Sequence, residues 1–163
     1  MIDIPKGLHL YQLTLDRAEA LWTKVSEYDR LFSDETRGDK EGWMRNLFDS
    51  RTLILETDDH QGLLFLSRIR EGLKAEVHAI MFDRRLGPRT DLVRQALVWA
   101  FMAFDLHRIG ATIPAASRAL RRWMIRLGFD VEGVVRNDFW YKGELADSLI
   151  MGLTRKGVLD GRG

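Results

Sequence analysis

The chain has 163 residues, of which 45% are hydrophobic and 30% charged, with 14 glycines and 3 prolines. This size and composition predict one folded domain and exclude collagen-like, mucin-like and disordered proteins. The chain has no cysteine, which excludes disulfide scaffolds, zinc–thiolate sites and cysteine nucleophiles, and its net charge of +1 argues against a protein that coats nucleic acid.

The N-terminal sequence lacks the basic and long apolar regions of a signal peptide. The longest apolar run, residues 96–104, is nine residues, against roughly 18 for a membrane span. We therefore expect a cytoplasmic protein with no membrane partner.

Hydrophobic periodicity predicts two helices and four strands in the first half of the chain. Residues 8–13 alternate apolar and polar side chains as a strand does, and Thr14 or Asp16 can cap a helix that ends near Phe32. A loop leads to a short helix over 42–48. The spacing of apolar residues then changes from that of a helix to that of extended strands. This predicts an antiparallel meander of strands over 52–56, 62–70 and 75–82.

The second half predicts two further helices, a strand between them and a closing hairpin. Residues 90–106 are apolar around most of a helix, so this helix should be buried against a sheet. A strand over 108–112 stops at Pro114, and Ser117 can cap a helix that ends at Gly128. Strands over 131–140 and 145–154 form the hairpin. The order β-α-α-β-β-β-α-β-α-β-β indicates one α/β domain over 1–155, followed by a polar tail over 156–163.

The charge is unevenly distributed along the chain. Residues 84–136 hold ten arginines, no lysine and four acids, whereas residues 1–60 hold 13 acids and eight bases. Arginine makes planar, forked contacts with phosphate and carboxylate, which favours a phosphorylated ligand for this half. The alternative is that these arginines cover solvated helix faces; a nucleic-acid contact through Arg118, Arg121, Arg122 and Arg126 is the least favoured interpretation.

Two C-terminal motifs, LGFDVEG over 127–133 and GELAD over 143–147, resemble the GNAT superfamily of acyl-CoA-dependent N-acyltransferases. They are most similar to the branch that acetylates protein N-termini, including those of ribosomal proteins. The resemblance covers about residues 8–155. It implies a mixed, mostly antiparallel sheet of about seven strands, with splayed central strands and flanking helices, and acetyl-CoA or CoA as co-substrate without a metal.

The resemblance also implies where CoA binds. The pantetheine arm would lie between strands 75–82 and 108–112, with the pyrophosphate on the loop before the helix at 90, where the helix dipole favours anions. The residues that it assigns to CoA are Ile80, Met81, Phe82, Arg84, Arg85, Gly87, Arg89, Thr90 and Ser117. The loop departs from the family pattern, because Arg89 replaces a small residue and Pro88 removes a backbone donor. Either the arginines replace the lost amide contacts, or the cofactor site is lost.

Acetyl transfer to an amine requires a neutral amine, a polarised thioester and a proton for the leaving thiolate. Glu76 and His78 lie two apart on one strand and share a face. The resemblance makes Glu76 the candidate base, because the family often has a glutamate on this strand, and His78 is a second candidate. Tyr141 near the last turn is a candidate proton donor. Met124 stands where the family often has a proton-donating tyrosine, and a thioether cannot take that role. Asp147 is interpreted as structural support.

The alternatives for these residues are structural. Glu76 would then pair with a neighbour, His78 would pack in the sheet and Tyr141 would be a surface aromatic. No two of the four histidines have helical ligand spacing, so the sequence predicts no metal site.

Two functions remain open. The first is an N-acetyltransferase acting on a primary amine, either a protein N-terminus or a small amine. The acidic segment from Asp29 to Glu41 would suit a cationic acceptor. The second is a non-catalytic GNAT-fold protein with an assembly, scaffolding or binding role, acting with a protein partner or as a homodimer.

Overall fold

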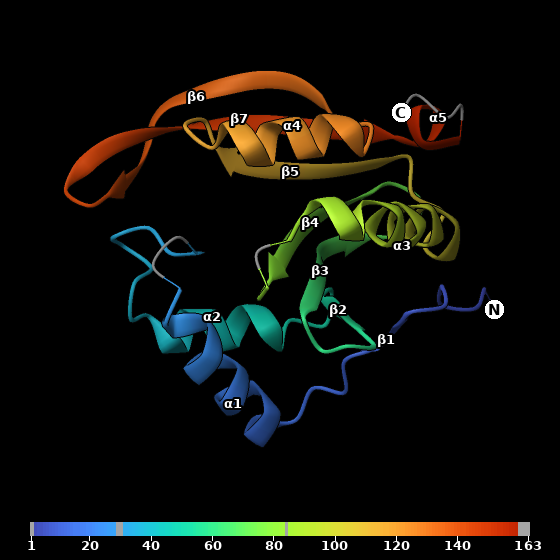
Figure 1. Ribbon diagram of the computed structural model, residues 1–163, viewed down its shortest axis with the longest axis horizontal. Coiled ribbons are helices and arrows are strands. Elements are labelled where there is room, and N and C mark those ends of the chain that lie inside the picture. The colour runs from blue at the N-terminus through green and yellow to red at the C-terminus, as the bar shows by residue number, and fades with distance from the viewer. Residues whose placement is uncertain (1, 29–30, 84, 160–163) are drawn as a thin grey trace.

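The computed structural model describes residues 2–28, 31–83 and 85–159. The elements follow the order predicted from the sequence, with a 3-10 helix before α3 and a short final helix where the sequence predicts a polar tail (Figure 1). In chain order they are β1 (Leu8–Leu10), α1 (Leu15–Ser26), α2 (Lys40–Leu47), β2 (Leu53–Thr57), β3 (Gly62–Arg70), β4 (Lys74–Met81), η2 (Gly87–Arg89), α3 (Thr90–Ala103), β5 (Arg108–Pro114), α4 (Arg118–Arg126), β6 (Asp130–Tyr141), β7 (Glu144–Thr154) and α5 (Arg155–Leu159).

The strands of the described residues form one seven-stranded sheet in the order β1-β2-β3-β4-β5-β7-β6. Neighbouring strands are antiparallel except β4 and β5, which are parallel. The mixed, mostly antiparallel sheet expected from the sequence is therefore confirmed.

The two central strands pair over only three positions. Lys74, Ala75 and Glu76 of β4 face Arg108, Ile109 and Gly110 of β5. Beyond these pairs β4 continues to Met81 and β5 to Pro114 with no further pairing between them. The central strands thus separate after Glu76, which confirms the expected splay.

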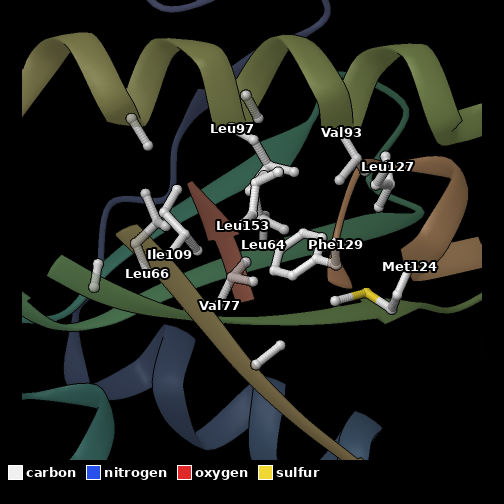
Figure 2. Close-up of a cluster of buried hydrophobic side chains, with 14 of the residues drawn as sticks. Leu64, Leu66, Val77, Val93, Leu97, Ile109, Met124, Leu127, Phe129 and Leu153 are labelled. Atoms are coloured by element: carbon white, nitrogen blue, oxygen red, sulfur yellow. The ribbon is translucent and has the colours of Figure 1, made fainter. Parts of the chain in front are cut away.

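Helices cover both faces of the sheet. On one face, α3 buries Val93, Leu97 and neighbouring apolar residues against the central strands, as Figure 2 shows. On the other face, Leu21 and Val25 of α1 pack with α2 and with the apolar side chains of β2 and β3. In Figure 1, α1 and α2 lie together, apart from α3. No helix in the described part of the chain is long and apolar enough to cross a membrane.

The end of α1 and the cap of α4 differ from the prediction. Thr14 caps α1 as expected, accepting a hydrogen bond from Arg17 N at 3.3 Å, but the helix ends at Ser26. Phe32 does not extend the helix; its ring folds back onto Trp22, with ring centroids 5.6 Å apart. Ser117 occupies the N-cap position of α4, but its side chain makes no capping hydrogen bond.

Candidate functional site

Glu76 and His78 lie on β4 where the central strands begin to separate. Glu76 occupies the last register position shared with β5, and His78 lies two residues beyond it. The intervening Val77 points into the core beneath α3, whereas Ile80 packs on the α1 and α2 side. Because side chains alternate along a strand, Glu76 and His78 face the α1 and α2 side, as the sequence predicts for a shared face.

The two candidate catalytic side chains have different surroundings. Arg68 Nη1 donates to both carboxylate oxygens of Glu76, at 3.1 and 3.4 Å, so Glu76 is held in an ion pair. His78 is exposed and makes no side-chain hydrogen bond with another described residue. Partial desolvation of the ring lowers the pKa of His78, against a weaker opposing effect of the Glu76 carboxylate. The lowered pKa favours the neutral imidazole, which is the form that can accept a proton.

Tyr141 lies at the end of β6, on a hairpin that the segment between α1 and α2 holds in place. Asp34 accepts backbone hydrogen bonds from Gly143 at 2.8 Å and Lys142 at 3.0 Å, and Glu35 accepts one from Trp140 at 3.0 Å. No hydrogen bond or ring contact joins Tyr141 to Glu76 or His78 in the described part of the chain. The structure thus brings two of the three predicted catalytic residues together, and the role of Tyr141 stays a prediction.

Several carboxylates of the acidic segment over 29–41, which was expected to attract a cationic acceptor, form hydrogen bonds within the fold. Asp34 and Glu35 hold the β6–β7 hairpin, and Asp39 caps α2 by accepting from Gly42 N at 2.9 Å. Asp29 lies outside the described residues. Binding of an amine by this segment therefore stays a prediction.

The loop between β4 and α3 is tied to the β2–β3 turn through Arg89. Its guanidinium contacts Asp59 at 2.9 Å and Asp83 at 2.7 Å, and the side chain is only 11% exposed. Arg89 is thus turned toward two carboxylates, in contrast to the predicted contact with phosphate. Arg85 is exposed, and Arg84 lies outside the described residues.

The start of α3 has open space beside its backbone, but the Thr90 hydroxyl is already engaged. A Cβ on Gly87 would meet no atom within 4 Å, so the backbone there is open. Thr90 Oγ1 donates to Gly87 O at 2.8 Å and accepts from Trp123 Nε1 at 3.0 Å, which fixes the first turn of α3 against α4. Ser117, on the loop after β5, keeps a hydroxyl without a capping bond.

The three predicted cofactor residues at the end of β4 offer mainly their backbone. The Ile80 and Met81 side chains pack on opposite faces of the sheet. Phe82 N donates to Gln61 O at 2.8 Å, and the Lys24 ammonium lies 3.5 Å from the Phe82 ring centroid. An extended ligand in the splay would therefore meet the unpaired β4 edge rather than these side chains.

A pocket lined by basic side chains, the basic hollow, lies beside Glu76 and was not predicted from the sequence. It has a volume of about 230 Å³ and is lined by Arg51, Arg68, Arg70, Lys74, Ala75 and Glu76. Its cations come from separate elements outside the arginine-rich segment, so no local pattern could have revealed it.

No family model and no curated protein sequence matches the chain. Among solved structures, it is similar to mutant forms of the spermidine/spermine N-acetyltransferase SpeG from Vibrio cholerae, with 18% identity, a TM-score of 0.74 and coverage of 96% of this chain and 98% of that chain. A chimera of that enzyme with hSSAT gives 19% identity, a TM-score of 0.75 and coverage of 95% and 99%. The structure of spermidine N-acetyltransferase from Vibrio cholerae in complex with CoA and spermine has 18% identity and a TM-score of 0.69. The match covers 95% of this chain and 99% of that chain. The chain has the GNAT fold.

Within the GNAT fold, two motif residues have structural roles. Asp147 Oδ1 accepts from Asn137 N at 2.9 Å across a register shift between β6 and β7, which confirms the supporting role expected for Asp147. Glu132 forms an ion pair with Arg108 of β5.

Met124, at the position of the family tyrosine, belongs to the GNAT-fold core. It is 5% exposed and, in Figure 2, lies beside Phe129. This position therefore supplies no proton to a bound ligand.

The arginine-rich segment divides into paired and exposed side chains. Arg89 and Arg108 are paired with carboxylates. The outer face of α4 is solvent-exposed, which fits both a solvated face and a nucleic-acid contact. Its arginines are Arg118, Arg121, Arg122 and Arg126.

Proposed function

We propose that this protein is an N-acyltransferase that moves the acetyl group of acetyl-CoA to a primary amine. The observation that carries the proposal is the separation of the central strands of a GNAT fold after the Glu76–Gly110 pair. Residues 77–81 of β4 then have no strand partner on their β5 side within the described residues. Free strand edges bind extended ligands through main-chain hydrogen bonds, and a pantetheine arm carries two amides that can form them.

His78 is the proposed proton carrier. The amine nitrogen forms a bond to the thioester carbonyl carbon, the C–S bond breaks, and the amine proton passes to the neutral His78 ring. The nearby Glu76 carboxylate stabilises the imidazolium, and the imidazolium returns a proton to the CoA thiolate. One residue thus serves as base and then as acid, so the reaction does not need a tyrosine at position 124.

The basic hollow favours an acceptor with an α-amino group. Neighbouring cations disfavour the ammonium form of an amine and so favour the neutral nucleophile. An α-amino group, with an ordinary pKa near 8, loses its proton more readily than an alkylamine near 10.4. Arg70 and Lys74 can pair with an anionic group beside that amine. A protein N-terminus with acidic residues fits the hollow better than a polyamine does.

Three departures from the family pattern favour a second function, a non-catalytic GNAT-fold protein that binds a partner. Arg89 is engaged by Asp59 and Asp83, Pro88 lacks a backbone donor, and Met124 is buried. These three departures all concern groups that would hold the pyrophosphate or protonate the thiolate.

The decisive experiment measures CoA binding and CoA release together. Calorimetric titration with acetyl-CoA tests the cofactor site, and thiol detection tests turnover with three acceptors: a peptide with an acidic second residue, a matched peptide with a basic one, and spermidine. We expect acetyl-CoA binding and fastest turnover with the acidic peptide. No binding at millimolar acetyl-CoA would leave the non-catalytic alternative.

Variants separate chemistry from folding. His78→Gln and Glu76→Gln should lower kcat, by about 100-fold for His78, while the affinity for acetyl-CoA stays unchanged. His107→Gln alters an exposed histidine that precedes β5 and serves as the matched control. Equal activity of the His78 and His107 variants would exclude the proposed proton carrier.

A further inference from the structure

The β1–β2 end of the sheet carries a His–Glu–His cluster formed by His9, Glu56 and His60. Each residue offers one ligand atom, and these atoms lie within 4.8 Å of one another. We propose that this cluster binds a divalent transition-metal ion, with Zn²⁺ as the expected occupant. Two imidazoles and one carboxylate are a common zinc ligand set, and a water molecule can complete the tetrahedron.

The pairing of β1 with β2 builds this site from residues far apart in the chain. His9 and Glu56 are direct partners in the antiparallel register, so their side chains project on the same face. His60 lies in the β2–β3 turn with φ +57°, a left-handed conformation, and its N donates to Thr57 O at 2.8 Å. The turn brings the third side chain back over the strand. The four histidines are therefore not all isolated in space, although they are isolated in the sequence.

The distances suit a small cation. His9 Nε2 lies 3.0 Å from Glu56 Oε2, and His60 Nδ1 lies 2.9 Å from Glu56 Oε1. In a tetrahedral site with bonds of about 2.1 Å, ligand atoms are about 3.4 Å apart. The two contacts with Glu56 must lengthen slightly to admit an ion, a change that side-chain rotations can supply.

Asp58 orients the first imidazole for metal binding. Its Oδ1 lies 3.0 Å from His9 Nδ1, so a proton on Nδ1 is held by this carboxylate. Nε2 lies 3.0 Å from Glu56 Oε2, so both ring nitrogens face carboxylates. A metal ion at Nε2 would displace the proton there, while Asp58 would keep the proton on Nδ1. Such a carboxylate behind a histidine is the usual outer contact of zinc-binding imidazoles.

Charge and access are also compatible with an ion. The Glu56 side chain is 10% exposed, while His9 and His60 are 40% and 67% exposed and leave an entry path. Arg17 Nη2 donates to Glu56 Oε2 at 3.3 Å and orients the carboxylate. The carboxylates of Glu56 and Asp58 together carry one more charge than Arg17, which favours a cation in place of the proton between His9 Nε2 and Glu56.

The test uses the full chain without a histidine tag, stripped with EDTA and titrated with ZnCl₂ by calorimetry at pH 7.5. We expect one Zn²⁺ per chain and a higher Tm on binding. A Co²⁺-loaded sample should show the visible absorption of tetrahedral cobalt. Absence of zinc binding would overturn the proposal.

Variants of exposed residues keep the test independent of folding. His9→Asn and His60→Asn should each weaken Zn²⁺ binding by about 100-fold, and Asp58→Asn by about 10-fold. His107→Asn and His78→Asn are the matched controls and should bind Zn²⁺ normally. Zinc binding that survives both His9→Asn and His60→Asn would also overturn the assignment. The test needs no acetyl-CoA, so its outcome is independent of the proposed enzymatic function.

Discussion

Arg108 of β5 and Glu132 of β6 form a two-bond ion pair directly over the backbone of Gly152 in the intervening strand β7. A Cβ on Gly152 would collide with Glu132 Oε1 and Arg108 Nη1. The glutamate of the LGFDVEG motif therefore links the edge strand β6 to β5 across β7, and it needs a glycine beneath it.

Gly152→Ala should destabilise the protein by displacing this pair. The side chains are 34% and 38% exposed, so the loss should be about 1 kcal/mol, the value for a solvent-screened pair. Without the pair, alanine in a strand is favoured over glycine by about 0.5–1 kcal/mol. Gly152→Ala should thus be slightly destabilising in the native chain, where the two effects nearly cancel, and stabilising by about 0.5–1 kcal/mol in Glu132→Ala. Urea unfolding of the native chain, the two single variants and the double variant measures the effect of Gly152→Ala in both backgrounds. Equal effects with and without Glu132 would contradict the coupling between Gly152 and the ion pair.

The contribution of the Arg108–Glu132 pair to folding stability should decrease at acidic pH. The hydrogen bonds from Arg108 lower the pKa of Glu132 below its ordinary value. The contribution to stability is therefore fully present above the unfolded pKa, about 4.3, and is lost as the pH falls through the folded pKa. The difference in Tm between the native chain and Glu132→Gln should be constant from pH 8 to 5.5 and shrink below about pH 4. A difference that persists to pH 2 would show that Glu132 acts through packing.

Thr90 and Trp123 give the second stability test. The indole N–H of Trp123, whose side chain is 1% exposed, donates to Thr90 Oγ1 at 3.0 Å. Thr90→Val keeps the shape and leaves this buried donor without an acceptor, which should cost about 1–3 kcal/mol. Thr90→Ser keeps the hydroxyl and should cost less. Denaturant unfolding distinguishes them, and a loss in Thr90→Val no larger than in Thr90→Ser would contradict a stabilising role of the hydroxyl.

Arg89 is predicted to position the loop before α3 rather than to hold phosphate. Arg89→Gln should lower the free energy of unfolding by about 1–2 kcal/mol, less than for a fully buried pair because Asp59 reaches solvent. Arg85→Gln removes an exposed cation of the same loop and should leave stability unchanged. If the proposed function holds, Arg85→Gln should weaken acetyl-CoA binding. An Arg89 variant of native stability that no longer binds acetyl-CoA would instead assign Arg89 to the phosphate.

Helices, strands and their buried faces could be predicted from the sequence, because the spacing of apolar residues determines them. The apolar circumference of 90–106 identifies α3, and the limits of β3 are predicted to the residue, because burial on a helix or strand leaves a direct pattern in the chain. The shared face of Glu76 and His78 follows from the same alternation.

Contacts that depend on pairing between distant segments were not predictable. From the sequence, Arg89 is predicted to bind phosphate. In the structure it instead contacts Asp59, which lies thirty residues earlier in the chain. His9 and His60 become neighbours only through the register of β1 with β2. The basic hollow likewise gathers cations from β3, from β4 and from the segment before β2. In each case one residue type fits several partners, and only tertiary pairing selects among them.

Asp34 should control the mobility of the β6–β7 hairpin. Its two oxygens accept from Gly143 N and Lys142 N, and these bonds, the former first, lower the pKa of Asp34. Asparagine has one carbonyl oxygen, so Asp34→Asn must leave one amide facing an NH₂ group. Hydrogen exchange at residues 142 and 143 should become faster, on the order of tenfold.

The matched control for Asp34→Asn is Asp39→Asn, which alters a nearby carboxylate that caps α2 and leaves the hairpin bonds intact. In the native chain, fast exchange should return only as the pH falls through the lowered pKa of Asp34, since the carboxylate must be protonated before the bonds weaken. If Tyr141 contacts the acceptor, Asp34→Asn should raise the KM for the amine and leave acetyl-CoA affinity unchanged. Native exchange rates in Asp34→Asn would show that strand pairing between Tyr141 and Glu144 suffices to hold the hairpin.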